Sequence, residues 1–280
     1  MEHIEFEWQT TDGLKLFAQA WRPDGECRAV VCLVHGLGEH TGRYGHVAAA
    51  LNQAGYALLG FDLRGHGHSE GQRGHTPTFD HMLDDVTHLL EEASQRFPDC
   101  LRFLYGHSLG GTLVLNHALR GRPQVAGVIA TGPLLRTAFT PPAWKTTLGR
   151  LLYGVWPRLS LSNGLDTTGL SRDAAVVSAY ANDPLVHDRV SARLGMDMLD
   201  AGEWTLAHAT EFFLPLLLMS GGADPITSAE ATRQFAAGVT GDCTLKIWDG
   251  LFHEIHNEPE QQQVFDVLIE WLGEHVPVSE

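Results

Sequence analysis

The chain has 280 residues, of which 44% are hydrophobic and 19% charged, as is typical of a globular protein that buries a sizeable core. Its 19 Lys+Arg against 34 Asp+Glu give a net charge of -15, which disfavours nucleic acid as a partner. The four cysteines form no C-x-x-C pair, so free thiols rather than a disulfide framework are expected.

The N-terminal segment, Met1 to Trp8, is acidic and lacks the basic and apolar regions of a signal peptide. No apolar run approaches the roughly 20 residues that span a bilayer. Even residues 212–219 are too short and contain a proline. These features predict a cytoplasmic protein, with peripheral contact to a membrane left open.

Strand and helix patterns alternate along most of the chain. The expected strands are residues 4–8, 14–21, 29–34, 56–61, 101–105, 125–131, 214–219 and 244–248. The expected helices are residues 44–54, 79–97, a segment beginning at 108, 171–180, 192–206, 229–237 and a final one through 264–272.

The first two strands alternate apolar with polar residues around Thr11-Asp12-Gly13, which predicts an antiparallel hairpin at the edge of a sheet. The βα alternation from residue 29 onward predicts a mostly parallel, doubly wound sheet. We therefore expect an α/β fold in one domain, residues 1–280. A helical cap, residues 134–212, would be inserted between the sixth and seventh core strands.

An apolar stripe runs through the expected cap at helical spacing, from Trp144 to Leu159. Packing of this stripe against the core is the simplest interpretation. Lining an acyl pocket or touching a membrane surface are the alternatives, and more than one of these roles can hold.

The motif Gly106-His107-Ser108-Leu109-Gly110 lies where a strand pattern meets a helix pattern. This is the setting of a nucleophile elbow, a sharp turn that lifts a serine hydroxyl above the sheet. A turn with an incidental serine is the competing interpretation. The context favours Ser108 as a nucleophile.

A serine hydroxyl needs an imidazole to take its proton, and the imidazole needs a carboxylate partner. The chain order Ser, acid, His is met by Ser108, Asp224 and His253, each of which follows an expected strand. Asp242 precedes its strand, and Asp249 occupies the position that a β-turn favours in Asp249-Gly250, so both are weaker candidates for the acid. His256 is the nearest rival for the base.

Two backbone N–H groups are needed to bind the oxyanion that develops during acyl transfer. Leu109 directly follows the nucleophile, and Leu37 lies in the loop after strand 29–34. We predict that these two residues supply the donors.

Other motifs carry less weight. His66-x-His68-x-Glu70 lacks the Asp-His pair expected of a metallohydrolase and is interpreted as a polar turn, so no metal is expected. The pair His253-x-x-His256 is likewise weak as a zinc site. Neither a Walker loop nor a dinucleotide motif is present, so no cofactor is expected.

With these motifs in place, the chain resembles an α/β-hydrolase of the monoacylglycerol lipase and lysophospholipase-like group. The resemblance covers nearly the whole chain. Its motifs are residues 35–44, 62–71, 106–111, 180–185 and 252–256. It implies the same triad and an α/β-hydrolase fold.

The resemblance also implies a polar pocket for the glycerol end of a substrate, formed by Glu39, Arg43, Tyr180 and His256. An i, i+4 ion pair is the alternative role for Glu39 and Arg43, and packing or capping for Tyr180 and His256. The chain departs from many members by carrying Leu109 where Met is common. Animal members have a smaller residue at the position of Leu37, so this leucine could narrow the pocket.

The sequence thus predicts a serine ester hydrolase that acts on monoacylglycerols, small-molecule acyl esters, through an acyl-enzyme. A lysophospholipase or a general carboxylesterase or thioesterase with the same triad is the main alternative. A serine aminopeptidase or a non-catalytic binding protein is more remote. Transient contact with a membrane or micelle through the cap fits the apolar stripe, and the oligomeric state is left open.

Overall fold

The computed structural model describes residues 1–140 and 142–277. Its strands are β1 Glu2–Gln9, β2 Lys15–Arg22, β3 Ala29–Val34, β4 Tyr56–Phe61, β5 Leu101–His107, β6 Gly127–Thr131, β7 Ser160–Ser162, β8 Arg189–Ser191, β9 Leu216–Gly221 and β10 Cys243–Trp248. Its α-helices are α1 Gly45–Gln53, α2 Phe79–Arg96, α3 Leu109–Gly121, α4 Ala143–Val155, α5 Ala174–Asn182, α6 Ala192–Ala207, α7 Ala229–Gly238 and α8 Gln261–Glu274. Short 3₁₀ turns are η1 Thr41–Tyr44, η2 Thr167–Gly169, η3 Ala209–Glu211 and η4 Ile255–Asn257.

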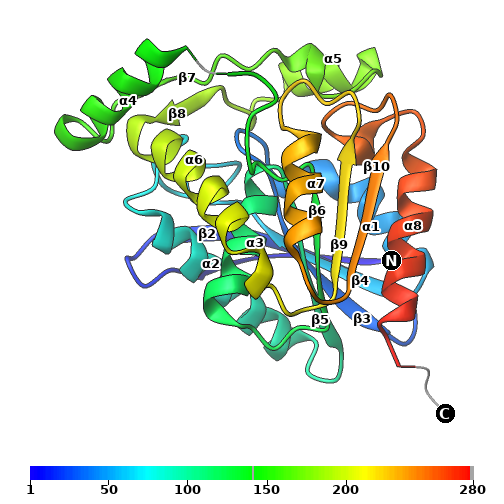
Figure 1. Ribbon diagram of the computed structural model, residues 1–280. Helices are drawn as coiled ribbons and strands as arrows, with labels where there is room; N and C mark the ends of the chain where they lie inside the picture. Colours follow the sequence, from blue (N-terminus) through cyan, green and yellow to red (C-terminus); the bar gives the residue numbers. More distant parts are fainter. Residues whose placement is uncertain (141, 278–280) are drawn as a thin grey trace.

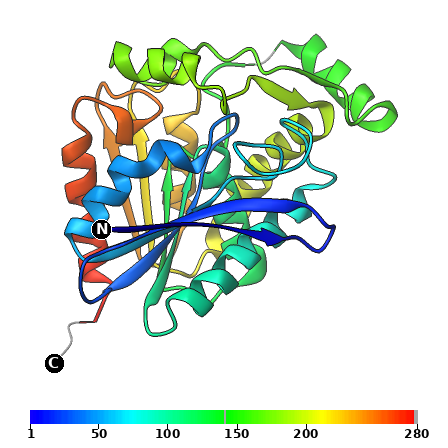
Figure 2. The same ribbon diagram turned by 180° about the vertical axis from the view of Figure 1, so that it is seen from behind.

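Eight strands form one sheet in the order β1-β2-β4-β3-β5-β6-β9-β10. The hairpin β1–β2 is antiparallel and also meets β4 in an antiparallel pairing, whereas all other neighbours are parallel. From behind, the hairpin crosses the near edge of the sheet (Figure 2). The expected α/β-hydrolase fold class is confirmed.

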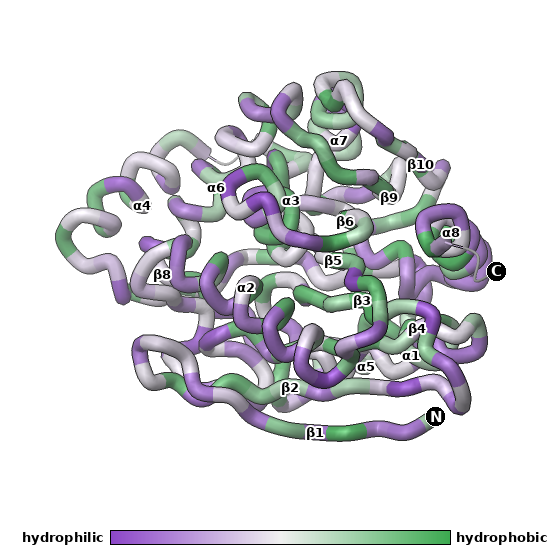
Figure 3. Tube along the Cα trace, turned by 90° about the horizontal axis from the view of Figure 1, so that it is seen from below, coloured by the Kyte–Doolittle hydropathy of each residue, from purple (hydrophilic) through white to green (hydrophobic). Residues whose placement is uncertain are grey.

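Hydrophobic side chains cover both faces of the sheet. Strands β3, β4, β6 and β9 are buried throughout. One apolar cluster packs α2, α3, α6 and α7 against the sheet, and a second packs α1 and α8 on the other face (Figure 1). The tube seen from below shows the hydrophobic segments gathered around β3 and β5 in the interior (Figure 3). A two-sided core of this kind requires continuously apolar strands.

The chain between β6 and β9 holds α4, the small antiparallel sheet β7–β8, α5 and α6. In Figure 1 α4 and α5 lie above the sheet, over the end where its parallel strands finish. We call the segment 134–212 the cap. Part of the cap meets the loops that follow core strands, as where the His187 N–H donates to the Gly38 carbonyl and the His253 N–H to the Gly169 carbonyl, whereas α6 runs down beside α3 on one face of the sheet.

The expectation that the cap's apolar stripe packs against the core is wrong. Within the described residues, α4 has no buried side chain. Trp144 is 65% exposed, Leu151 62% and Val155 77%. The helix leans on α6, where a Cβ added at Gly149 would lie 2.9 Å from Met196 Cε, and Leu152 is only half-buried.

Some element boundaries also differ from expectation. Tyr44 belongs to a 3₁₀ turn, Thr41–Tyr44, and the α-helix begins at Gly45. The strand expected from residue 214 begins at Leu216 because Pro215 has no N–H to donate to a neighbouring strand.

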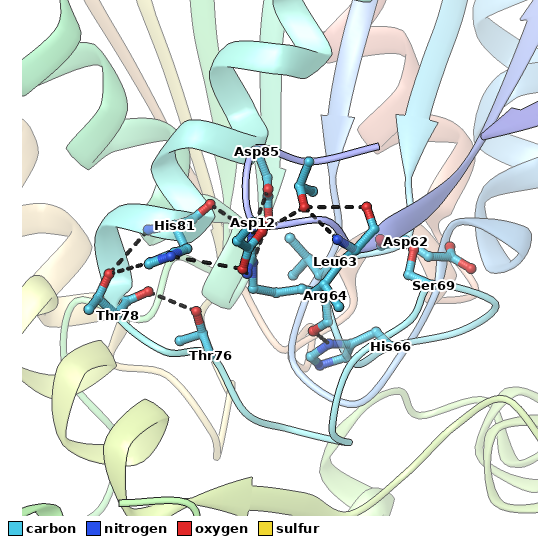
Figure 4. Close-up of polar contacts among 12 residues, drawn as sticks. Asp12, Asp62, Leu63, Arg64, His66, Ser69, Thr76, Thr78, His81 and Asp85 are labelled. Atoms are coloured by element: carbon cyan, nitrogen blue, oxygen red, sulfur yellow. Dashed lines mark hydrogen bonds and ion pairs between the residues drawn. The ribbon is translucent and has the colours of Figure 1, made fainter. Parts of the chain in front are cut away.

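A buried ion-pair network holds the loop after β4 against α2 and the hairpin (Figure 4). Arg64 donates to both Asp85 oxygens at 2.7 and 2.8 Å and to Asp12 at 3.0 Å. Asp62, in the same loop, accepts hydrogen bonds from Thr41 and from the His68 backbone. The side chains of Arg64 and Asp85 are each 2% exposed, so neither charge has water as a substitute partner.

Removal of this buried cation should destabilise the fold. We expect Arg64→Met to lower the free energy of unfolding by about 3–5 kcal/mol, because it leaves the Asp85 carboxylate buried without its partner. Urea unfolding measures the change. The matched surface variant Arg233→Met, which loses only an exposed pair 3.9 Å from Glu230, should change it by less than about 0.5 kcal/mol. Equal losses in the two variants would contradict the assigned role.

Candidate active site

Ser108 occupies a strained turn between β5 and α3. Its φ is 56° and its ψ -116°, a positive φ that few residues with a side chain adopt. A Cβ added at Gly106 would lie 2.2 Å from the Gly110 carbonyl oxygen, and one at Gly110 would lie 2.0 Å from that of Val34. Only glycine fits at these two positions, because the turn packs directly against β3.

Asp224 and His253 are in contact at the ends of β9 and β10. His253 Nδ1 lies 2.7 Å from Asp224 Oδ2. The other carboxylate oxygen accepts the backbone N–H groups of Ile226 and Thr227, at 2.7 and 3.0 Å. The Thr227 hydroxyl donates to Asp224 Oδ2 at 2.7 Å, a contact that the sequence pattern did not suggest.

The charges of this pair follow from burial and from the contact itself. Burial raises the pKa of Asp224, but the His253 charge and the hydrogen bonds outweigh burial and hold it below its ordinary value. Asp224 is therefore ionised and can only accept, so Nδ1 of His253 carries the proton. Burial lowers the pKa of His253, and the Asp224 carboxylate overcomes this and raises it above 6.5.

Ser108 and His253 line the same cavity beneath the cap. The apolar part of its wall comes from Leu37, Leu134, Phe139, Leu165, Leu170, Met198 and Ile226. Besides Ser108 and His253, the polar part comes from Glu39, His107, Thr137, Asn163, Tyr180 and Glu254. Among the described residues, neither lysine nor arginine lines this cavity. It can thus hold a molecule with one apolar and one polar end.

The two residues expected to donate to an oxyanion flank Ser108. Leu37 lines the cavity, and Leu109 is the first residue of α3. Neither backbone N–H donates a hydrogen bond to any residue in the described part of the chain. By contrast, the Gly36 N–H is engaged, at 2.7 Å from Glu39 Oε1. Both leucine N–H groups thus lack a protein acceptor among the described residues, and that of Leu37 belongs to a residue of the cavity wall.

The four residues that the family resemblance assigns to substrate divide into two pairs. Glu39 and Tyr180 line the cavity, whereas Arg43 and His256 are absent from its wall. Arg43 lies between Glu39 and Glu254 and pairs with both. The Glu39–Arg43 ion pair, 2.9 Å long, is the i, i+4 contact expected as the alternative role.

His256 is packed among aromatic rings. Its ring stacks on Tyr44 at 5.0 Å and meets the edge of His107 at 4.8 Å. Burial lowers the pKa of His256 well below the ordinary value, so the ring is neutral. Neither ring nitrogen has a hydrogen-bond partner among the described residues.

Glu254 is the cavity residue that sequence reasoning missed. It follows His253 directly and is 2% exposed. A charged residue beside a loop histidine is an ordinary surface pattern, and only the contact with Arg43 on another loop distinguishes it. Its position next to His253 was the single signal available.

The weaker candidates lie elsewhere. Asp242 pairs with His275 at 3.0 Å, and Asp249 is exposed. His66 Nδ1 contacts the Arg64 carbonyl, while the Glu70 carboxylate accepts the Lys15 N–H. Across residues 1–140 and 142–277, no group of three or more His, Cys, Asp or Glu side chains is arranged to hold a metal ion.

Comparison with known proteins places this geometry in a family. A family model described as "Serine aminopeptidase, S33" matches residues 25–260. The chain is 31% identical to a monoacylglycerol lipase of Mycolicibacterium smegmatis, over 97% of this chain and 98% of the relative. A crystal structure of Paleococcus ferrophilus monoacylglycerol lipase is 37% identical, with a TM-score of 0.84, 98% coverage of this chain and 100% of that one.

Two further relatives have other descriptions. An abhydrolase domain-containing protein of Dictyostelium discoideum is 38% identical over 95% of this chain, which spans only 28% of that longer protein. A Bacillus subtilis protein named phospholipase is 31% identical over 91% of this chain and 99% of its own length. In the described residues, no helix has the length and hydrophobicity needed to cross a membrane.

The region matched by the family model contains strands β3 to β10 together with Ser108, Asp224 and His253, and the resemblance first noted in the motifs extends to relatives matched over nearly their full length. The protein is accordingly a carboxylic ester hydrolase, and its chain belongs to the α/β-hydrolase family described as serine aminopeptidase, S33.

Proposed function

We propose that the protein hydrolyses monoacylglycerols to glycerol and free fatty acid, with Ser108, His253 and Asp224 as the catalytic triad. The observation that carries the proposal is the cavity that Ser108 and His253 both line, whose wall combines apolar side chains with polar ones and, among the described residues, contains neither lysine nor arginine. The names of the Mycolicibacterium and Paleococcus relatives support it.

In the proposed reaction Ser108 Oγ attacks the ester carbonyl while His253 Nε2 takes the hydroxyl proton. The N–H groups of Leu37 and Leu109 bind the oxyanion, and loss of one such donor costs roughly 3 kcal/mol of transition-state stabilisation. His253 then gives the proton to the departing glycerol oxygen, which leaves an acyl-enzyme. Water, deprotonated by His253, attacks the acyl carbon and releases the fatty acid and Ser108.

The mixed lining of the cavity matches both parts of such a substrate. The pKa of Glu39 is about 2, so its carboxyl group is ionised. Burial raises this pKa, but Arg43 and other nearby groups lower it by more than burial raises it. Its carboxylate accepts hydrogen bonds from glycerol hydroxyls, and the Tyr180 hydroxyl offers a donor. Leu134, Phe139 and Met198 provide apolar surface for the acyl chain.

A lysophospholipid is the second candidate, favoured by the name of the Bacillus relative. Its phosphate would enter a cavity whose charged wall residues among those described are Glu39 and Glu254. A buried anion without a cationic partner is costly. The cavity therefore favours a neutral head group.

The exposed apolar side chains of α4 form a surface that can contact the lipid layer from which the substrate comes. Trp144, Leu151 and Val155 share one face of α4, since they are spaced by seven and four residues, and Lys145 lies next to Trp144. An apolar helix face of this kind buries itself in the boundary of a lipid layer. We propose that the cap contacts micelles or membranes transiently through this face.

Head-group preference tests the proposed substrate. Wild-type protein should hydrolyse a medium-chain monoacylglycerol at least about tenfold faster, in kcat/KM, than the lysophosphatidylcholine with the same acyl chain, because the phosphate lacks a cation in the cavity. Ser108→Ala should lose both activities and labelling by a fluorophosphonate, whereas Ser94→Ala on α2 should retain them. Preference for the lysophospholipid, or for an amino-terminal peptide amide, would overturn the substrate assignment.

The pH dependence follows from His253, which must be neutral to take the Ser108 proton. Because Asp224 raises its pKa above 6.5, kcat/KM should be full at alkaline pH and fall as the pH drops, with a midpoint above 6.5. A pH series on a neutral ester measures this midpoint. Asp224→Asn should lower kcat about 10⁴-fold. An acid limb below pH 6.5 in the wild-type protein would contradict the assignment of His253.

Vesicle binding tests the role of α4. Leu151→Glu should weaken sedimentation with phosphatidylcholine vesicles and slow hydrolysis of vesicle-borne monoacylglycerol several-fold, because it places a charge in the lipid boundary. Hydrolysis of a water-soluble nitrophenyl ester should be unchanged. Thr146→Glu adds the same charge away from the apolar face and serves as the control. If both variants bind vesicles like the wild type, the contact lies elsewhere.

A further inference from the structure

We propose that Arg43 is a positioning residue that clamps the oxyanion loop, residues 35–38, to the base loop, residues 249–254, and that it does not bind the substrate. The proposal rests on the proposed function only in taking Ser108 and His253 as the reacting pair. It differs from the role that the family resemblance implies for Arg43.

The contacts of Arg43 are directed at protein groups. Nη1 and Nη2 donate to the two oxygens of Glu254 at 2.7 and 2.6 Å, a bidentate pair. Nη1 also donates to Glu39 Oε2 at 2.9 Å. The guanidinium lies over the Tyr180 ring, 4.7 Å from its centroid. Arg43 is absent from the cavity wall. Both of its Nη groups already donate to protein carboxylates before a substrate arrives.

On one side the clamp reaches the oxyanion loop through Glu39. The second oxygen of Glu39 accepts the Gly36 N–H at 2.7 Å and the Tyr44 hydroxyl at 2.9 Å. This fixes the Gly36 peptide and leaves the next N–H along the loop, that of Leu37, without a protein acceptor. The position of the Leu37 donor thus depends on the carboxylate that Arg43 holds.

On the other side the clamp reaches the base loop through Glu254. Glu254 is bonded covalently to His253, and its own N–H donates to the Leu170 carbonyl at 2.8 Å. Its Oε2 also accepts from Asn257 Nδ2 at 2.8 Å. Arg43 is therefore the shared partner of two carboxylates. Glu39 lies next to the oxyanion loop, and Glu254 lies next to His253.

Loss of Arg43 would leave Glu39 and Glu254 as buried like charges in one cavity wall. Their repulsion is strong where water is excluded, and it would push the two loops apart. Proton transfer and oxyanion binding both depend on distances near 3 Å, and a displacement of about 1 Å can cost ~10²-fold in rate. The effect should appear in kcat, whichever alcohol the ester carries.

Two substrates separate positioning from binding. Arg43→Met should lower kcat about 10- to 100-fold on both a monoacylglycerol and a nitrophenyl butyrate, with KM within about twofold, and should slow fluorophosphonate labelling equally. Nitrophenyl butyrate has no glycerol. A rise in KM for the monoacylglycerol with the nitrophenyl ester unaffected would show that Arg43 binds substrate, and unchanged kcat on both would also overturn the proposal.

Companion variants test whether the clamp depends on contact of Arg43 with both carboxylates. Arg43→Lys keeps the charge but cannot hold both carboxylates in a planar fork, so it should recover part of the lost kcat. Glu254→Gln alone should lower kcat about 3- to 10-fold. In the Arg43→Met background the same change removes one unpaired charge, so the double variant should be faster than Arg43→Met. Additive losses in this cycle would contradict the clamp.

Controls keep the outcome interpretable. Arg64→Met removes another buried bidentate ion pair, so it should cost stability while leaving kcat of the folded protein on nitrophenyl butyrate within about twofold. If Arg43→Met does not fold, Arg43→Lys and Glu254→Gln carry the test with the same two substrates. Failure of the wild type to cleave monoacylglycerols would refute the proposed substrate but leave the nitrophenyl and labelling results to decide the clamp.

Discussion

The close packing of the Ser108 turn against β3 is the constraint on which the site depends. Gly106 and Gly110 bring two backbone segments so near that a Cβ at either position would collide with a carbonyl oxygen. The contact holds Ser108 at a positive φ, and the N–H groups at the start of α3 have no partner within the helix. The turn is strained, and the buried strands on either side supply the stability that maintains it.

Around this turn, buried charge organises the loops. Asp224 holds the His253 ring by Nδ1, and Arg43 holds Glu39 and Glu254. In the loop after β4, Arg64 holds Asp85 in the same bidentate manner and also donates to Asp12 (Figure 4). Each buried carboxylate has a cation, an imidazole or backbone donors within hydrogen-bond distance, as burial of charge requires. The loops are thereby fixed to one another as well as to the sheet.

Apolar and polar side chains are distributed over the cavity wall and the cap in a way that fits the proposed substrate. The cavity wall combines apolar and polar side chains, and both the cap and the core loops supply residues of each kind, which suits an amphipathic substrate. The outer face of α4 remains apolar and exposed. This exposed apolar face would hold the cap at a lipid phase, and the substrate would pass from the lipid into the cavity.

The sequence by itself determined the sheet, the cap segment and the residues at the strand ends. Continuous apolar runs such as 29–34 leave no solvent face, and Gly106 and Gly110 mark a turn that only glycine can form. Only the tertiary structure decided that Arg43 and His256 lie behind the cavity wall and that Glu254 lines it. It also decided that α4 is exposed. These outcomes depend on which loops meet, and contacts such as Arg43 with Glu254, 211 positions apart, leave no periodic pattern in the chain.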